Sequence, residues 1–208
     1  MLTSAELMRA GPVMAVLTLE AAADAVPVAR ALLAGGIRAL EVTLRTPEAL
    51  RAIEALSGVD GALAGAGTVL CVDDAARAAA AGARFLVSPG FRPALADAAR
   101  RLALPWLPGV ATASEIMAAR EAGFDDLKFF PAETSGGAAA VAAFAGPFPM
   151  ARFCPTGGIT QANAPRYLAL ANVACVGGSW LAPRDLVARR DWAEIEARAR
   201  AAAALARG

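Results

Sequence analysis

The sequence predicts an α/β fold in which eight strands, each followed by a helix, close into a single (β/α)8 TIM barrel with an extra N-terminal helix. Short runs rich in Val, Ile, Leu and Phe recur at a stride of roughly 21 to 25 residues, and eight such strides are the count of a closed parallel barrel. Between them lie stretches rich in Ala, Leu, Arg and Glu, which are typical of helices. An open, doubly wound sheet would need a glycine fingerprint after its first strand, where the chain has Leu19-Glu20-Ala21. The length of 208 residues fits one domain over residues 1–208.

Strands and helices are expected to alternate along the chain. The predicted strands are Pro12–Leu17, Ile37–Leu44, Ala62–Ala66, Arg84–Val87, Pro105–Leu107, Leu127–Phe130, Arg152–Cys154 and Val173–Val176. The predicted helices between them are Leu19–Ala34, Pro47–Leu56, Asp73–Ala81, Pro93–Leu102, Ala113–Ala122, Gly137–Phe144 and Gln161–Leu170. Leu2–Ala10 is expected to form the extra helix and Asp191–Arg207 the last one.

Several of these helices carry start and stop signals. Thr46-Pro47 and the pattern Thr112-x-x-Glu115 are typical helix starts, because a threonine hydroxyl can accept a hydrogen bond from a backbone N–H of the first turn. Glycines that favour a helix end follow three segments, at Gly35, Gly82 and Gly123.

The composition excludes several classes of function. Hydrophobic residues make up 57% of the chain and charged residues 19%, with a net charge of +1, so neither disorder nor nucleic-acid binding is expected. No signal peptide and no membrane-spanning run is visible in the sequence, so we expect a cytoplasmic protein without a membrane partner.

The chain contains no histidine, which removes Ser-His-Asp and Cys-His nucleophile systems and histidine metal sites. Its three cysteines are Cys71, Cys154 and Cys175, and none forms a Cys-x-x-Cys pair. This pattern argues against a disulfide framework or a zinc site and fits a reducing compartment.

The functional face of a parallel barrel lies at the carboxyl ends of its strands. The polar residues predicted at those ends are Glu41, Thr43, Arg45, Thr68, Ser88, Lys128, Thr156 and Ser179. We therefore expect these side chains to surround one site.

Lys128 is the most informative of these residues. It is the only lysine among the 20 Lys and Arg residues, and it lies in the apolar run Leu127–Phe130. A guanidinium stays protonated and cannot act as a nucleophile, whereas an uncharged amine can. The sequence therefore predicts a lysine that forms an imine, in surroundings that favour the uncharged amine. A lysine held in a structural ion pair is the alternative.

The second predicted strand carries an acid and a cation on one face. Glu41, Thr43 and Arg45 share that face, while Leu40 and Val42 share the other, because side chains alternate along a strand. The apolar face should meet the helices, so Glu41 and Arg45 should point toward the barrel axis. Near an imine, a carboxylate can transfer protons and a guanidinium can bind a substrate carboxylate. A purely structural ion pair is the alternative.

Two glycine pairs follow the seventh and eighth predicted strands, in Thr156–Ile159 and Gly177–Trp180. Many barrels bind phosphate at this place on backbone N–H groups, so we expect a phosphate site there. Taken alone, Ser88–Gly90 and Gly65–Thr68 read as strand-to-helix turns, and Glu133 as a local cap or ion pair.

Six segments together resemble the bacterial 2-keto-3-deoxy-6-phosphogluconate (KDPG) aldolase family, which also includes enzymes that act on 4-hydroxy-2-oxoglutarate. They are Glu41–Thr46, Gly65–Leu70, Ser88–Gly90, Lys128–Glu133, Phe153–Ile159 and Gly177–Leu181. The resemblance implies a class I aldolase, a homotrimer of (β/α)8 barrels, that needs no metal or other cofactor. Its substrate would be a phosphorylated keto acid, KDPG, cleaved to pyruvate and D-glyceraldehyde 3-phosphate, with side activity on 4-hydroxy-2-oxoglutarate.

The resemblance also implies a role for each site residue. Lys128 would form the Schiff base and Glu41 would transfer protons. The substrate-binding residues would be Arg45 and Thr68 for the pyruvate carboxylate, Phe130 beside the reacting carbons, Gly157, Gly158, Gly178 and Ser179 for the phosphate, and Thr156 and Pro89 for the configuration at C4. Relatives that act on the galactonate epimer differ at Thr156 and in the Ser88–Gly90 turn, which favours the gluconate substrate.

The residues leave three alternatives open. A phosphate-binding barrel could isomerise or condense a phosphosugar, with Glu41 as base and Lys128 only as a cation. A non-catalytic barrel could bind a phosphorylated metabolite. A metal-dependent aldolase is disfavoured by the absence of histidine, although carboxylates alone can hold Mg²⁺.

Overall fold

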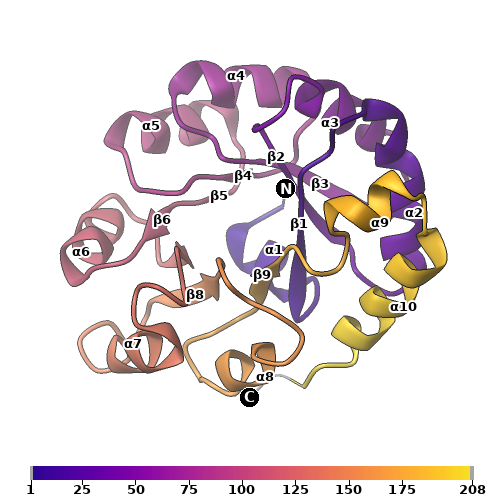
Figure 1. The fold of residues 1–208 in the computed structure, drawn as a ribbon. Helices are drawn as coiled ribbons and strands as arrows, with labels where there is room; N and C mark the ends of the chain where they lie inside the picture. Colours follow the sequence, from indigo (N-terminus) through magenta and orange to yellow (C-terminus); the bar gives the residue numbers. More distant parts are fainter. Residues whose placement is uncertain (1, 207–208) are drawn as a thin grey trace.

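Nine short strands surrounded by helices form the centre of the computed structural model, which describes residues 2–206 (Figure 1). The strands are β1 (Val13–Leu17), β2 (Ala39–Thr43), β3 (Leu63–Gly67), β4 (Leu86–Val87), β5 (Trp106–Leu107), β6 (Gly109–Val110), β7 (Asp126–Phe129), β8 (Arg152–Pro155) and β9 (Val176–Gly178). Every strand pair is parallel. The carboxyl ends of all nine strands therefore lie at the same end of the molecule.

The strands form two hydrogen-bonded ladders rather than one continuous ring of eight. One sheet has the order β5-β4-β3-β2-β1-β9 and the other the order β6-β7-β8. Two isolated parallel bridges, Phe153↔Val173 and Thr156↔Gly177, connect β8 with the chain around β9. The parallel α/β architecture predicted from the sequence is thus confirmed, and the closed eight-stranded ladder is not present as such.

The break between the ladders lies at Pro108, which separates β5 from β6. Proline has no backbone N–H group, so it cannot donate within a ladder. The carbonyl of Leu107 accepts a hydrogen bond from Ser88 at 3.3 Å, on the β4 side, whereas the carbonyl of Pro108 accepts one from Lys128 at 2.9 Å, on the β7 side. The fifth predicted strand, Pro105–Leu107, consequently continues as a second, unpredicted strand after the proline.

Helices cover the outside of the strands (Figure 1). They are α1 (Ser4–Arg9), α2 (Ala25–Ala34), α3 (Ala49–Ser57), α4 (Val72–Ala80), α5 (Pro93–Leu102), α6 (Ala113–Glu121), α7 (Gly137–Ala143), α8 (Ala164–Leu168), α9 (Arg184–Ala188) and α10 (Trp192–Ala203), with a 3-10 turn, η1, at Ala22–Asp24. None of these helices in residues 2–206 has the length and apolar character needed to cross a bilayer. Short α9 was not predicted. The predicted helix Leu19–Ala34 contains η1, and its α-helical part begins only at Ala25. Arg207, the expected end of the last helix, lies outside the described residues.

The helix-start signals had different outcomes. Thr112 and Glu115 form the predicted capping box at the start of α6. Thr46-Pro47 does not start α3, which begins at Ala49; the Thr46 hydroxyl instead donates to the carbonyl oxygen of Leu19 at 2.6 Å. That bond ties the loop after β2 to the loop after β1, at the end of the sheet where the polar residues gather.

Two hydrophobic clusters lie on opposite faces of the strands. Leu40 and Val42 of β2 belong to the cluster between sheet and helices, as the alternation predicted. Ala39 belongs to the second cluster, which fills the space enclosed by the strands and includes Leu7 and Met8 of α1. The extra N-terminal helix therefore packs against the inner side chains at the amino ends of the strands.

Candidate active site

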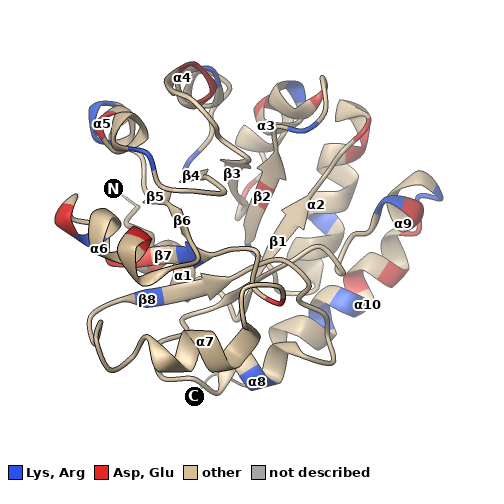
Figure 2. Cartoon of the chain, turned by 60° about the vertical axis from the view of Figure 1, so that its left-hand side comes forward, with Lys and Arg blue, Asp and Glu red and all other residues tan. Residues whose placement is uncertain are grey.

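Lys128 and Glu41 form a buried ion pair in the space between the two ladders. Lys128 lies on β7 and Glu41 on β2, and the Nζ–Oε1 distance is 3.1 Å. The two residues are only 4% and 1% exposed. Figure 2 shows that most other charged segments lie on the outer helices. The lysine nitrogen thus lies within the fold and in contact with a carboxylate, although the two residues are 87 positions apart in the chain.

Glycine on the neighbouring strand provides the space for Glu41. Gly67 ends β3, and a Cβ atom added there would collide with the Glu41 carboxylate. Its lack of a side chain lets the acid fold over the end of β3 toward Lys128. The segment Gly65–Leu70 therefore contributes to the site through an absent side chain as well as through Thr68.

Phe130 covers the lysine from the other side. The Lys128 Nζ atom lies 5.1 Å from the centroid of the Phe130 ring, within the range of a cation–π interaction. Phe130 also lines the main cavity, so it stands between the buried amine and the open pocket. An apolar ring at this position limits the access of water to the amine.

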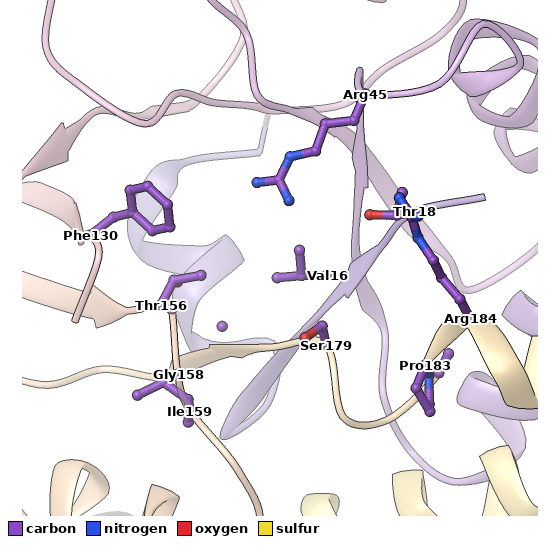
Figure 3. Close-up of a pocket in the computed structure, with 13 residues that line it drawn as sticks. Val16, Thr18, Arg45, Phe130, Thr156, Gly158, Ile159, Ser179, Pro183 and Arg184 are labelled. Atoms are coloured by element: carbon purple, nitrogen blue, oxygen red, sulfur yellow. The ribbon is translucent and has the colours of Figure 1, made fainter. Parts of the chain in front are cut away.

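Arg45 and Thr68 meet at the ends of β2 and β3. The Arg45 Nε–H group donates to the Thr68 hydroxyl at 3.1 Å. Thr68 has a φ of +58°, a left-handed conformation that costs a β-branched residue free energy and occurs most often where function demands it. Figure 3 shows the guanidinium of Arg45 extending into the cavity. With Nε fixed, its terminal N–H groups remain available for an anion.

A cavity of about 450 Å³ opens at the carboxyl ends of the strands (Figure 3). Six of the predicted site residues line it, namely Arg45, Phe130, Thr156, Gly157, Gly158 and Ser179. Lys128 and Glu41 lie behind Phe130, and Thr68 lies behind Arg45. The predicted residues thus surround one site, with the exceptions of Pro89, Gly178 and Ser88. The Ser88 hydroxyl donates to the carbonyl of Gly90 and accepts a hydrogen bond from the indole N–H of Trp106, away from the cavity.

Pro89 and Gly178 have neighbours other than the cavity. A Cβ atom added at Gly178 would collide with the indole ring of Trp180, so this glycine admits the tryptophan ring. Pro89 lies against Gly109, where an added Cβ atom would collide with the Pro89 carbonyl group. Neither residue is among those that line the cavity.

The turn after β8 contains two consecutive glycines in the left-handed conformation. Gly157 and Gly158 have φ values of +100° and +77°, which only glycine adopts without strain. Ser179, on the neighbouring turn after β9, is exposed, and its side chain makes no hydrogen bond among residues 2–206. Its hydroxyl is therefore free to bind a ligand in the cavity.

Glu133 supports this turn from behind. Its carboxylate accepts hydrogen bonds from Arg166 at 2.6 and 2.7 Å and from the hydroxyl of Tyr167, and its backbone N–H donates to the carbonyl of Gly157 at 3.1 Å. The bonds from Tyr167 and then Arg166 lower the pKa of Glu133. Burial, followed by the bond to Glu133 and its charge, raises the pKa of Tyr167 to about 12. Glu133 does form an ion pair, but not a local one: its partners lie on α8, 33 and 34 positions along the chain.

Ile159 and Gly177 of the predicted glycine turns also line the cavity. Five further lining residues were not singled out by the sequence: Val16, Thr18, Ala182, Pro183 and Arg184. Thr18 follows β1 and contacts the Thr43 hydroxyl at 2.9 Å, so its place as a polar residue at a strand end could have identified it. Arg184 follows a turn that carried no predicted helix, and nothing in the sequence separates it from the other arginines.

Comparisons with known proteins agree with this geometry. The family model described as KDPG and KHG aldolase matches residues 5–198. The chain belongs to this family. A 2-dehydro-3-deoxy-phosphogluconate aldolase of Pseudoalteromonas atlantica is 48% identical over 99% of this chain and 96% of its own length. The corresponding aldolase of Pseudomonas aeruginosa is 51% identical over 91% of this chain and 87% of its own length.

Solved structures of KDPG aldolases have the same fold. The Zymomonas mobilis enzyme with 3-phosphoglycerate is 47% identical, with a TM-score of 0.95, over 99% of this chain and 97% of its own. The Legionella pneumophila enzyme, with pyruvate captured as a covalent carbinolamine, is 43% identical, with a TM-score of 0.95, over 98% of this chain and 99% of its own. The resemblance found in the sequence is therefore confirmed along the whole chain.

Proposed function

We propose that this chain is a class I aldolase that cleaves KDPG to pyruvate and D-glyceraldehyde 3-phosphate, with side activity on 4-hydroxy-2-oxoglutarate. The observation that carries the proposal is the single lysine of the chain, buried within 3.1 Å of Glu41 and beneath the ring of Phe130. The names of the relatives support the substrate, and the carbinolamine captured in the Legionella enzyme supports the covalent chemistry.

The reaction begins when the uncharged Lys128 amine attacks the C2 carbonyl carbon of the keto acid. The Lys128–Glu41 contact lets the carboxylate accept the ammonium proton and then donate it to the hydroxyl of the carbinolamine, which leaves as water. The product is a protonated imine, which withdraws electrons from C3. The Phe130 ring limits the access of bulk water to the imine, which slows premature hydrolysis.

Bond cleavage uses the same carboxylate. Glu41 removes the proton from the C4 hydroxyl, the C3–C4 electron pair moves into the imine, and the aldehyde product leaves. Protonation of the resulting enamine at C3, followed by attack of water, releases pyruvate and restores the free lysine. One carboxylate beside one amine is sufficient for every proton transfer in this sequence.

The cavity provides a binding region for each end of the substrate. We assign the pyruvate carboxylate to Arg45, held by Thr68, and the phosphate to the Gly157–Gly158 turn and Ser179. Thr156 lines the cavity between these regions, which supports a part in the C4 preference. For Gly178 we propose a role in admitting Trp180, and for Pro89 an indirect one through its turn. Binding energy from the remote phosphate would orient the reacting carbons.

Borohydride trapping tests the proposal. Incubation with pyruvate and borohydride should add one reduced pyruvate unit to Lys128, observed by peptide mass spectrometry, and the Lys128→Arg variant should gain none. Pyruvate release should follow from KDPG and, more slowly, from its galactonate epimer and 4-hydroxy-2-oxoglutarate. An unmodified Lys128 would exclude imine chemistry and favour an isomerase or a non-catalytic binding barrel. Activity lost on exhaustive chelation would instead favour a metal-dependent aldolase.

We also propose how the rest of the molecule is organised. In our interpretation residues 1–208, of which 1 and 207–208 lie outside the described part, form one domain, and the two ladders are one (β/α)8 ring in which β5 and β6 together are the fifth strand. The homotrimer and the cytoplasmic location remain predictions. Light scattering on the purified protein would test the trimer.

A further inference from the structure

Arg184 lies at the cavity and has no role in the mechanism derived above. It is the first residue of α9, it is exposed, and it lines the cavity together with Ser179 and Pro183. We propose that Arg184 is a specificity-determining residue that binds the substrate phosphate and so favours phosphorylated over unphosphorylated keto acids. The proposal rests on the proposed function and deepens it.

The cavity is lined by two cations and no anion. Among its 13 lining residues the only ionisable side chains are Arg45 and Arg184. The whole chain carries a net charge of only +1, so this is a local concentration of positive charge. Walls of one sign attract a ligand of the opposite sign into a cleft. A substrate with two anionic groups fits such a cavity better than a substrate with one.

The spacing of the two arginines suits a substrate with an anion at each end. Arg45 follows β2 and Arg184 follows β9, and β1 lies between these strands. The ends of β2 and β9 are thus two strand spacings apart, or about 10 Å, and the turn after β9 brings Arg184 to the same cavity. An extended six-carbon chain spans about 8 Å from its C1 carboxylate to a phosphate on C6. Figure 3 shows Arg45 at the top of the cavity and Arg184 at its right-hand side, with Ser179 between Arg184 and Gly158.

Arg184 is held in place by a contact that a phosphate can replace. Its guanidinium lies 3.4 Å from the carboxylate of Glu20, and the two side chains are 65% and 63% exposed. An exposed ion pair of this kind contributes little free energy, so its loss costs little. A phosphate dianion carries more charge than Glu20 and can accept two parallel hydrogen bonds from a guanidinium. Glu20 therefore holds Arg184 at the cavity in the free protein and competes weakly with the substrate.

The residue that caps the C-terminus of α9 provides a matched control. Arg189 is also exposed, at 61%, and also pairs with a carboxylate, that of Asp185, at 3.1 Å. It is not among the residues that line the cavity. A change at Arg189 removes the same charge from the same region without removing a group from the cavity wall.

Steady-state kinetics of Arg184→Met and Arg189→Met test the proposal. For KDPG we expect Arg184→Met to lower kcat/KM about 10- to 100-fold, the effect of one lost charged hydrogen bond. Part of this loss should appear in kcat, because the phosphate also orients the reacting carbons. For 4-hydroxy-2-oxoglutarate, which is shorter and has no phosphate, kcat/KM should change less than about 2-fold. Glu20→Gln should lower KM for KDPG. Arg189→Met should leave the kinetic constants for both substrates unchanged. Equal changes for both substrates in Arg184→Met, or none, would overturn the proposal.

Phosphate binding separates this proposal from the proposed function. If the wild-type protein cleaves neither substrate, the proposed function fails, but titration with inorganic phosphate still measures the site. Weaker binding in Arg184→Met than in Arg189→Met would then support the phosphate role of Arg184. Equal phosphate affinity in the two variants would overturn it whatever the activity.

Discussion

Lys128 and Glu41 are ionisable side chains in a place where ionisable side chains are costly. Removing two charges from water costs several kcal/mol for each ion, which a single contact seldom restores in full. The pair has one direct contact, the 3.1 Å hydrogen bond, and an aromatic ring on one side. Well-packed apolar residues in place of such a pair often leave a protein equally stable or more stable. Stability alone therefore does not explain the Lys128–Glu41 pair, which favours the functional interpretation.

Replacing Glu41 with glutamine should remove catalysis and leave the fold unchanged. Glutamine has the same shape and can still accept a hydrogen bond from Lys128, but it cannot accept the proton. We expect kcat to fall by about 10²- to 10⁴-fold, the usual contribution of a general acid or base. Steady-state kinetics would measure the loss, with thermal unfolding as a control. A Gln variant within about 10-fold of wild-type activity would rule out this role for Glu41.

The sequence identified side chains with an unusual chemical type more readily than side chains with an unusual position. Lys128 was predicted because it is the only lysine and lies in an apolar run. Its contact with Glu41 required the fold, since β7 and β2 pair with other strands and meet only across the interior. Arg184 was not predicted because only its position beside the cavity sets it apart from the other arginines. An exposed arginine has no distinctive local sequence pattern.

At the scale of elements, the network of Glu133, Arg166 and Tyr167 joins the loop after β7 to α8. Glu133 stands five residues after Lys128, and its partners lie on the helix that follows the glycine turn. A Cβ atom at Gly158 would approach the Glu133 side chain within 2.8 Å, so the turn packs tightly on this network. The lysine strand and the expected phosphate turn therefore keep a fixed relative position.

Tyr167 is the only tyrosine of the chain, so its ionisation can be followed alone by phenolate absorbance. Burial, and then the bond to Glu133 and its charge, raise the pKa of Tyr167 to about 12, above the ordinary value of 10. The folded state thus holds this proton more tightly than the unfolded state. Its contribution to stability is complete below about pH 10 and is lost as the pH rises toward 12.

Rapid pH jumps on the wild-type protein should therefore give an apparent pKa near 12 for Tyr167. The Glu133→Gln variant should give a lower value, because the neighbouring negative charge is gone. Glu115→Gln, far from the network in the capping box of α6, should leave the titration unchanged. A folded wild-type protein that ionised at the ordinary value would contradict the network.

Strand β3 provides a second prediction at this scale. The change Gly67→Ala would insert a methyl group where the Glu41 carboxylate lies, and we expect the acid to move away from Lys128. Activity should fall at least about 10-fold, since misplacement of a catalytic group by 1 Å can cost far more. Gly58→Ala is the control, because nothing lies within 4 Å of its added Cβ atom. Equal activities for the two variants would show that Glu41 tolerates displacement.

Element positions were predictable wherever hydrophobic pattern and helix ends agreed. Pro93–Leu102 has the predicted bounds, because its proline start and its last apolar residue are both clear. The strand Gly109–Val110 was not predicted, since two residues after a proline carry no periodicity. The five residues of α9 were not predicted either, because they form little more than one turn. Short elements of this kind depend on tertiary contacts.

On the scale of the whole molecule, chemistry and packing occupy opposite ends of the strands. Lys128, Glu41 and the cavity lie toward the carboxyl ends, whereas Leu7 and Met8 of α1 pack among inner side chains at the amino ends. Substitutions in the amino-terminal helix should consequently affect stability without affecting the reaction.

Leu7→Ala tests this separation. Leu7 is 1% exposed, so we expect its truncation to lower the free energy of unfolding by about 2 to 5 kcal/mol. KM and kcat should stay within about 2-fold of wild type at a temperature where the variant is folded. Met117→Ala, at a side chain that is 61% exposed, serves as the surface control for chemical denaturation. A large change in KM with unchanged stability would place α1 in the site.

The single, buried lysine also makes the covalent step detectable by proteolysis. A lysine-specific endoproteinase can cut this chain at one peptide bond, after Lys128, and the native fold hides that bond. The denatured protein should yield two fragments of 128 and 80 residues, since 208 − 128 = 80. Borohydride reduces the imine to a stable secondary amine, which this proteinase does not recognise. Protein treated with pyruvate and borohydride should therefore survive digestion as one band on a gel.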